Sequence, residues 1–312
     1  MEVLKKEFKV PSSDGIHTLS GVVFEPIGEI RGFFQIAHGM TEYIGRYERF
    51  MRDMAKEGYL TFGYDHLGHG ATVQNESELG YIAKRDGWRF LARDIGAFAE
   101  AVFAFYGKKE RPYVLMGHSM GSFVVRVAAE HYVHPDALIL MGTGGPNPAA
   151  GAGIALTSVI RFICGERHVS RLIDTIAFGS YNRNFTDATE KAPDPWLTTD
   201  VEVRERYAAD PLCTFPFTVS AMGDLMRLLK YSNRAAWYQN LDVKLPVLLV
   251  SGKDDPVGDF GKGIELVHKG LLNSGHVAEC ILYEGARHEI LNDFTYEKVK
   301  EDILAFYDQY CF

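Results

Sequence analysis

The chain has 312 residues, of which 24% are charged and 46% hydrophobic, a composition typical of globular proteins. Its formal net charge of −8 at pH 7 argues against a nucleic-acid partner, because phosphate binding requires a basic surface. The four cysteines lie far apart without metal-ligand spacing, and a core of this size needs neither a metal nor a disulfide. We therefore expect reduced thiols and no cofactor.

The first residues, Met1–Glu7, lack the apolar core of a signal peptide. Nowhere does an apolar run approach the roughly 20 residues that a membrane span requires. We therefore expect a cytoplasmic protein.

Along the chain, short apolar runs alternate with longer stretches of helical periodicity, which is typical of βα units around a mostly parallel sheet. The pattern predicts eight strands, at 5–10, 17–26, 32–37, 60–64, 113–117, 137–141, 246–251 and 277–283. It predicts core helices at 47–57, 87–106, 119–131, 263–272 and 297–310. The first two strands flank a Ser-Ser-Asp-Gly turn and should form an antiparallel hairpin.

The alternation fails between residues 144 and 239, where the sequence has helix-like periodicity, several prolines and no convincing strand. We predict a core made of residues 1–143 and 240–312, with residues 144–239 inserted as a helical cap. Within the cap, Ala149–Ile163 is unusually apolar for a surface segment. It could pack on the core, line a tunnel for an acyl chain, or make transient contact with a membrane surface.

The strongest local motif is Gly117-His118-Ser119-Met120-Gly121, which fits G-x-S-x-G. In a chain with 31 glycines the pentapeptide alone could arise by chance. Its position after an apolar strand and before a helix is that of a nucleophile elbow, a sharp turn that tolerates only small flanking residues. We therefore predict that Ser119 is a nucleophile exposed at the carboxyl edge of the sheet.

A serine hydroxyl is a weak nucleophile and needs a neighbouring base. Hydrolases with this elbow carry the acid and then the histidine after the serine in chain order. Six histidines satisfy that order: His131, His134, His168, His268, His276 and His288. Only His288 follows the last predicted strand at its carboxyl end, so we predict that it is the base. The acid should follow the strand at 246–251, where the Pro-Val that comes next favours Asp255 over the adjacent Asp254.

Two further loops should lie beside the elbow. His38-Gly39-Met40 follows the strand at 32–37, and the Met40 amide should donate to the oxyanion together with the amide of Met120. The second loop, Asp65–Gly70, holds one aspartate and two histidines, which could bind a metal. Its glycines favour a tight turn whose polar side chains bond within it, so we expect no metal there.

Taken together, these motifs resemble the α/β-hydrolase superfamily, and more narrowly its monoacylglycerol lipase and lysophospholipase branch, sometimes grouped with serine aminopeptidase-like hydrolases. Residues 38–47, HGMTEYIGRY, are similar to the HG-x-x-E-x-x-x-RY signature of that branch, and residues 207–212, YAADPL, to its cap signature. The resemblance covers nearly the whole chain. Ser122 departs from it, because the branch usually has a second glycine there.

The resemblance implies an α/β-hydrolase fold, with a mostly parallel eight-stranded sheet flanked by helices and an inserted helical cap. It implies a triad of Ser119, Asp255 and His288, and an oxyanion hole formed by the amides of Met40 and Met120. It also makes three residues candidates for contacting a glycerol-like head group: Glu42, Arg46 and Tyr207.

These features lead to three hypotheses for the function. The first is a serine ester hydrolase that cleaves monoacylglycerols or similar small acyl esters through an acyl-enzyme. The second is an aminopeptidase or amidase, which would need an acidic cluster for the substrate amine; Glu166, Asp174 and Glu190 lie in the predicted cap. The third is a non-catalytic ligand receptor on the same fold, which usually lacks a triad member, whereas none is missing here.

Overall fold

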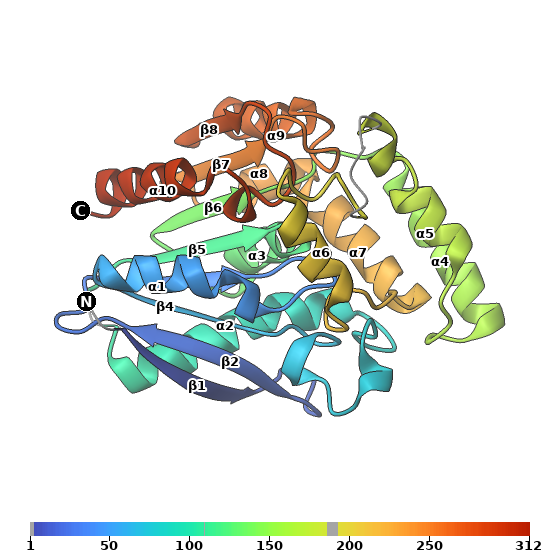
Figure 1. The fold of residues 1–312 in the computed structure, drawn as a ribbon, viewed down its shortest axis with the longest axis horizontal. Coiled ribbons are helices and arrows are strands. Elements are labelled where there is room, and N and C mark those ends of the chain that lie inside the picture. Colours follow the sequence, from blue (N-terminus) through green and yellow to red (C-terminus); the bar gives the residue numbers. More distant parts are fainter. Residues whose placement is uncertain (1–2, 109, 186–192) are drawn as a thin grey trace.

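The computed structural model describes residues 3–108, 110–185 and 193–312. At its centre is an eight-stranded sheet in the order β1-β2-β4-β3-β5-β6-β7-β8 (Figure 1). The strands are β1 (Leu4–Pro11), β2 (Thr18–Glu25), β3 (Gly32–Ala37), β4 (Tyr59–Tyr64), β5 (Tyr113–His118), β6 (Ala137–Met141), β7 (Val247–Gly252) and β8 (Ala278–Tyr283). β2 pairs antiparallel with β1 and β4, and the other neighbouring pairs are parallel. The predicted mostly parallel α/β sheet is confirmed.

Helices cover both faces of the sheet, which is why β3 to β7 are buried along their whole length. One face carries α1 (Glu48–Lys56) and α10 (Tyr296–Cys311). The other carries α2 (Gly87–Tyr106), α3 (Met120–His131) and α9 (Lys262–Asn273). These five helices lie within a residue or two of the predicted positions, because each has a clear apolar stripe facing the sheet.

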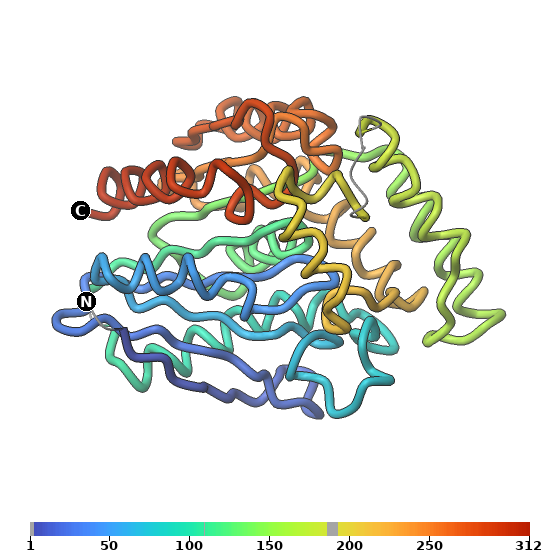
Figure 2. Tube along the Cα trace, in the orientation of Figure 1, coloured from blue at the N-terminus to red at the C-terminus, as the bar shows by residue number. Residues whose placement is uncertain are grey.

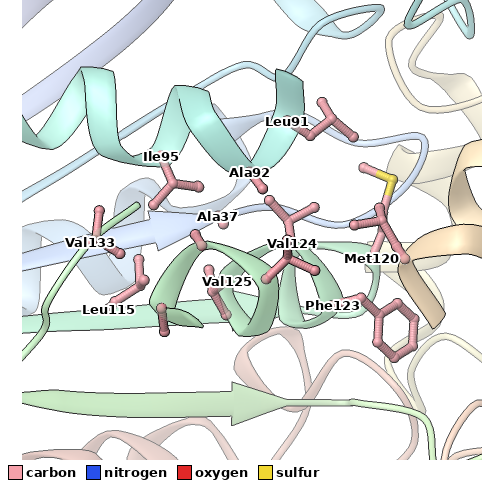
Figure 3. Packing of buried hydrophobic residues seen from close by; sticks show 14 of the residues in the cluster. Ala37, Leu91, Ala92, Ile95, Leu115, Met120, Phe123, Val124, Val125 and Val133 are labelled. Atoms are coloured by element: carbon pink, nitrogen blue, oxygen red, sulfur yellow. The ribbon is translucent and has the colours of Figure 1, made fainter. Parts of the chain in front are cut away.

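The helix that follows the elbow is held tightly. In Figure 3, side chains of α3 pack between α2 and the sheet, where Val124 lies near Ala92 and Val125 lies on the side of α3 toward the sheet. Both valines have no solvent exposure. A helix packed in this way fixes the position of the turn that precedes it, because well-packed interiors resist small displacements.

Between β6 and β7 the chain forms helices and loops. The helices are α4 (Ala150–Cys164), α5 (Arg171–Phe178), α6 (Val201–Ala209), α7 (Val219–Ser232) and α8 (Ala235–Asn240), with a 3-10 turn at Tyr181–Asn184. In the described residues of this segment the only strand-like pairing is a single bridge between Val169 and Thr218. No helix in the described part of the chain is both long and apolar enough to cross a membrane.

Two parts of this segment lie in different places. The arm is α4 and α5 together, which lie beyond α7 at the edge of the molecule (Figure 1). The strap is Pro195–Thr199, an irregular stretch that runs beside the loop after β8, and Figure 2 shows this yellow segment next to the red one. Whether the segment is a separate cap with ends at 144 and 239 stays a prediction.

Candidate active site

The predicted elbow lies between β5 and α3. Ser119 has φ 52° and ψ −119°, a strained backbone conformation that ordinary residues rarely adopt. A Cβ atom on Gly117 would lie 2.4 Å from the carbonyl oxygen of Gly121, and one on Gly121 would lie 2.2 Å from that of Ala37. Both distances are far inside van der Waals contact, so the turn requires glycine at both positions. The serine side chain is therefore presented at the carboxyl end of β5.

His288 and Asp255 come together from two different loops. His288 Nδ1 lies 2.8 Å from Asp255 Oδ2, and both side chains are buried. The carboxylate is itself held, because Val257 N–H donates to Oδ1 at 2.8 Å and Ser251 Oγ donates to Oδ2 at 3.2 Å. Asp254 is exposed instead. Of the two candidate acids, only Asp255 is in contact with the imidazole.

Ser119 and His288 both lie next to Gly142, at the carboxyl ends of β5 and β6. Ser119 N–H donates to Met141 O at 3.0 Å, which places the serine beside Gly142. A Cβ on Gly142 would lie 3.1 Å from Cε1 of His288, so the imidazole packs directly on this glycine. In the described part of the chain the Ser119 hydroxyl forms no hydrogen bond with His288, and such bonds often shorten only when substrate binds.

The loop after β3 lies against the elbow. A Cβ on Gly39 would lie 3.1 Å from Cβ of Ser119, so the peptide between Gly39 and Met40 borders the serine. Among the loop, turn and cap hydrogen bonds of the described residues, neither the Met40 nor the Met120 amide donates to a backbone carbonyl. Both amides are predicted oxyanion donors, and the first residue of a helix such as α3 normally has a free N–H.

A buried carboxylate joins this loop to the elbow. Glu42 Oε1 accepts hydrogen bonds from Gly39 N–H at 2.5 Å and from the Tyr47 hydroxyl at 2.8 Å, and lies 3.1 Å from His118 Nδ1. Burial alone raises the pKa of Glu42, but the hydrogen bond and charge of His118 and the charge of Arg46 outweigh it and lower the pKa. Burial likewise lowers the pKa of His118, and Glu42 reverses the shift and raises it.

An ion pair extends this network to the histidine loop. Arg46 Nη1 and Nη2 each donate to one oxygen of Glu289 at 2.6 Å, and Arg46 Nη1 also donates to Glu42 Oε2 at 2.8 Å. Burial alone lowers the pKa of Arg46, but the two carboxylates raise it. Because Glu289 directly follows His288, this bidentate pair connects the loop after β3 with the loop that carries the histidine.

The three candidate head-group residues are near one another. Glu42 and Arg46 belong to the network just described, and the Arg46 guanidinium lies 4.8 Å from the ring centre of Tyr207. The Tyr207 hydroxyl, on α6, donates to Thr41 O at 2.9 Å and lies 2.9 Å from Thr41 Oγ1. The structure thus brings the three residues together, with most of their polar atoms engaged by protein groups.

The strap covers the other side of the histidine. The Trp196 ring lies 5.1 Å from the His288 ring, centre to centre. His288 N–H donates to Trp196 O at 3.3 Å, and Glu289 N–H donates to Leu197 O at 2.7 Å. Tyr181 continues the aromatic contact, with its ring 5.1 Å from that of Trp196. The imidazole therefore lies between Trp196 and His118, whose ring is 4.7 Å away.

The turn at Asp65–Gly70 bonds largely within itself and to the loop after β3. Asp65 accepts from Ile44 N–H at 2.8 Å and from Ala71 N–H at 2.7 Å. Burial lowers the pKa of His66 and of His69, the latter to about 3. Across residues 3–108, 110–185 and 193–312, no group of three or more His, Cys, Asp or Glu side chains is arranged to hold a metal ion.

The acidic residues considered for an aminopeptidase do not form a cluster where the structure describes them. Glu166 and Asp174 lie on different parts of the arm region, and burial raises the pKa of Asp174 without a partner carboxylate. Glu190 lies outside the described residues.

Sequence reasoning did not single out Glu289 and Trp196. Glu289 had one available signal, an acidic residue next to the predicted base. Nothing in the sequence around Trp196 indicates its contact with a histidine 92 positions away, because that contact depends on how the strap is placed.

Comparison with known proteins matches the chain to one hydrolase family and to lipases. The family model described as "Serine aminopeptidase, S33" matches residues 28–295. A monoacylglycerol lipase of Mycolicibacterium smegmatis is 25% identical over 95% of this chain and 98% of its own, and a monoglyceride lipase of Rattus norvegicus is 24% identical over 85% and 78%.

Solved structures also share the fold. A thermostable carboxyl esterase from Bacillus coagulans, in complex with glycerol, has a TM-score of 0.92 with 25% identity, covering 99% of both chains. A soluble variant of monoglyceride lipase from Saccharomyces cerevisiae has a TM-score of 0.74 with 20% identity, covering 100% of this chain and 96% of its own.

Proposed function

Since this chain belongs to the serine aminopeptidase S33 family of α/β-hydrolases and is a lipase- or esterase-like serine hydrolase, we propose that it cleaves monoacylglycerols or similar small acyl esters. Ser119, His288 and Asp255 act as the triad, and the amides of Met40 and Met120 form the oxyanion hole. The substrate class is supported by the relatives, which are named as monoacylglycerol lipases and a carboxyl esterase.

One observation carries the mechanism: the 2.8 Å contact between His288 Nδ1 and Asp255 Oδ2, next to a strained serine elbow. The contact leaves Nε2 of the imidazole as the nitrogen that can accept a proton, because the carboxylate fixes the tautomer with the proton on Nδ1. Asp255 also stabilises the imidazolium that forms during the reaction. This arrangement fits base-assisted attack by a serine hydroxyl.

In the proposed reaction, the Ser119 hydroxyl attacks the ester carbonyl and its proton passes to Nε2 of His288. The carbonyl oxygen becomes an oxyanion held by the Met40 and Met120 amides, each contributing on the order of 3 kcal/mol to the transition state. Collapse breaks the ester bond, and the imidazolium returns its proton to the leaving alcohol. Water, activated by His288, then hydrolyses the acyl-serine and restores the free hydroxyl.

The test replaces Ser119 by alanine. We expect Ser119→Ala to reduce turnover of p-nitrophenyl butyrate and of a monoacylglycerol by roughly 10⁴-fold or more, and to abolish labelling by a fluorophosphonate. Ser274→Ala, at an exposed serine after α9, is the matched control and should retain full activity. Residual activity of Ser119→Ala near that of the parent protein would refute the assignment. A parent protein that fails to react with the fluorophosphonate would favour a non-catalytic receptor.

The family description gives one specific reason to test peptide substrates. An aminopeptidase would hydrolyse an N-terminal proline amide, whereas the proposed esterase would act on monoacylglycerol. Measuring kcat/KM for both substrates with the same preparation separates the two functions, and faster cleavage of the amide would overturn the ester proposal.

We also propose that residues 144–239 act as a cap and that the arm contacts lipid surfaces. One face of α4 packs on α7, where a Cβ on Gly153 would lie 3.3 Å from Met226. The other face of α4 leaves Val159, Phe162 and Ile163 exposed, and α5 leaves Leu172 and Ile176 exposed. Exposed apolar patches of this kind mark interaction sites. Flotation with phosphatidylcholine vesicles tests the contact, and a protein that stays in the soluble fraction would contradict it.

A further inference from the structure

Thr41 has an unusual backbone conformation. It is one of six non-glycine residues with positive φ in the described part of the chain, at φ 52°. A β-branched residue in the left-handed region is a genuine outlier, because its side chain collides with the backbone there. Such strain persists only when the surrounding structure holds it, and it clusters at functional sites. Two of the six, Thr41 and Ser119, flank the proposed reaction centre.

The contacts of Thr41 come from two separate elements. The Tyr207 hydroxyl, on α6, donates to Thr41 O at 2.9 Å and lies 2.9 Å from Thr41 Oγ1. Thr41 N–H donates to Nε2 of His69 at 3.3 Å, in the turn after β4. One phenol thus binds both polar oxygens of the strained residue, and no other side-chain group in the described ranges bonds to either of them.

The strained residue directly follows the predicted oxyanion donor. The Met40 N–H belongs to the Gly39–Met40 peptide. The peptide before it is anchored by the Gly39 N–H bond to Glu42, and the peptide after it, which carries the Thr41 N–H, is anchored by His69. Rotation of Thr41 out of the left-handed region would displace the Met40–Thr41 peptide, which shares the Met40 Cα atom with the peptide that carries the Met40 N–H. The direction of the Met40 N–H therefore depends on what holds Thr41.

We propose that Tyr207 is a positioning residue of the oxyanion hole: its hydroxyl holds Thr41 in the left-handed conformation that directs the Met40 amide toward the carbonyl attacked by Ser119. The inference rests on the proposed function, because it assumes the Met40 amide as donor. It differs from the head-group role that family resemblance implies for Tyr207. It also connects α6, between β6 and β7, to the reaction centre through a single side chain.

The two roles of Tyr207 predict different kinetics for Tyr207→Phe. A phenol that binds the glycerol head group would matter for monoacylglycerol and not for p-nitrophenyl butyrate, which has no such group. A phenol that positions the oxyanion donor would lower kcat by the same factor for both substrates, about tenfold or more, with KM little changed. In that case Tyr207→Phe would also weaken the binding of an alkyl trifluoromethyl ketone by a similar factor, because this inhibitor forms an oxyanion adduct with serine.

The decisive variant removes the strain. Glycine adopts positive φ freely, so in a Thr41→Gly background the Tyr207→Phe substitution should cost no more than about threefold in kcat, compared with about tenfold in the parent protein. Thr41→Val changes the other partner of the contact. It keeps the strain of a β-branched residue and removes one of the two hydrogen bonds with Tyr207, so we expect an intermediate loss of kcat.

Tyr43→Phe is the matched control. The Tyr43 hydroxyl also bonds a residue near α6, donating to Asp210 Oδ2 at 3.0 Å, but it does not touch Thr41, so kcat should be unchanged. Equal losses from Tyr207→Phe in the parent protein and in the Thr41→Gly variant, or a loss confined to monoacylglycerol, would overturn the inference. Failure of the proposed function would look different, because Ser119→Ala would then remain active whatever Tyr207→Phe does.

Discussion

The strap and the arm belong to the same stretch of chain between β6 and β7, yet their surroundings differ. Hydrogen bonds fasten the strap to the histidine loop at nearly every residue: Arg287 donates to Pro195 O and Thr198 O, Thr198 Oγ1 donates to Asn292 O, and Thr199 N–H donates to Asp293. The arm instead packs on α7 through one face of α4 and leaves its other face to solvent.

The difference shows that the segment is not one uniform lid. A lid that opened as a single body would have to break the bonds of the strap and pull on the loop that carries His288. The arm contacts the rest of the protein largely through α4 on α7 and is exposed on its other face, and exposed elements move at lower free-energy cost than elements that are bonded into the site. We infer that any opening involves the arm, while the strap stays as a fixed wall of the site.

Asp293 gives the strongest test of the fixed strap. Its carboxylate accepts from Thr199 N–H at 3.0 Å and from the Thr199 hydroxyl. Asp293→Ala should lower the free energy of unfolding by about 2–3 kcal/mol, since bonds to charged groups are worth more than neutral ones, and should lower kcat about tenfold as Trp196 and His288 lose their alignment. Urea unfolding and ester kinetics measure both, with exposed Glu301→Ala as control. Unchanged kcat would mean that the strap does not hold the histidine.

Asp224, on the helix α7 that supports the arm, should make the stability of the protein depend on pH. Burial raises the pKa of Asp224 to about 7 from 3.8, so the folded protein binds this proton more tightly than the unfolded chain. The contribution of protonated Asp224 to the free energy of unfolding is fully present below pH 4 and is lost as the pH rises to 7. Between pH 5 and pH 7 the wild-type protein should lose about 2 kcal/mol relative to Asp224→Asn. Parallel stability curves for the two proteins would contradict this expectation.

Substitutions on the exposed face of the arm should have the smallest effect on the stability of the folded protein. Phe162 and Ile163 are 91% and 73% exposed, so Phe162→Ser with Ile163→Ser should change the free energy of unfolding by less than about 0.5 kcal/mol. The turnover of p-nitrophenyl butyrate should also be unchanged. If the arm contacts lipid, hydrolysis of emulsified monoacylglycerol should slow. A large loss of stability would show that this exposed face of the arm also packs on the rest of the protein, and the comparison with the strap would fail.

Much of the fold could be predicted because its signals are local. The strands are apolar runs bounded by loops, and the elbow is fixed by sterics at Gly117 and Gly121 that any serine at this turn must meet. Adjacent side chains point apart, so only one of Asp254 and Asp255 can contact the histidine, and the Pro-Val that follows favoured Asp255. The structure places Asp255 against His288 and leaves Asp254 exposed.

The rest depends on contacts between distant parts of the chain. Arg46 and Glu289 are 243 positions apart, and no periodicity or motif connects them. The left-handed conformation of Thr41 is equally hidden, because threonine is among the residues least expected to adopt it. Sequence patterns therefore predicted the proposed reacting groups, while the groups that hold them in place required the tertiary structure.

The long separation between Arg46 and Glu289 also bears on biosynthesis. At about 5–20 residues per second, a ribosome needs on the order of 10 to 50 seconds to reach the second residue after making the first. During that time Glu42 and Arg46 exist without the carboxylate that completes their buried cluster, and His288 has not been made. The newly made N-terminal portion is therefore an incomplete hydrolase that exposes its future interior, and chaperones would meet it in this form.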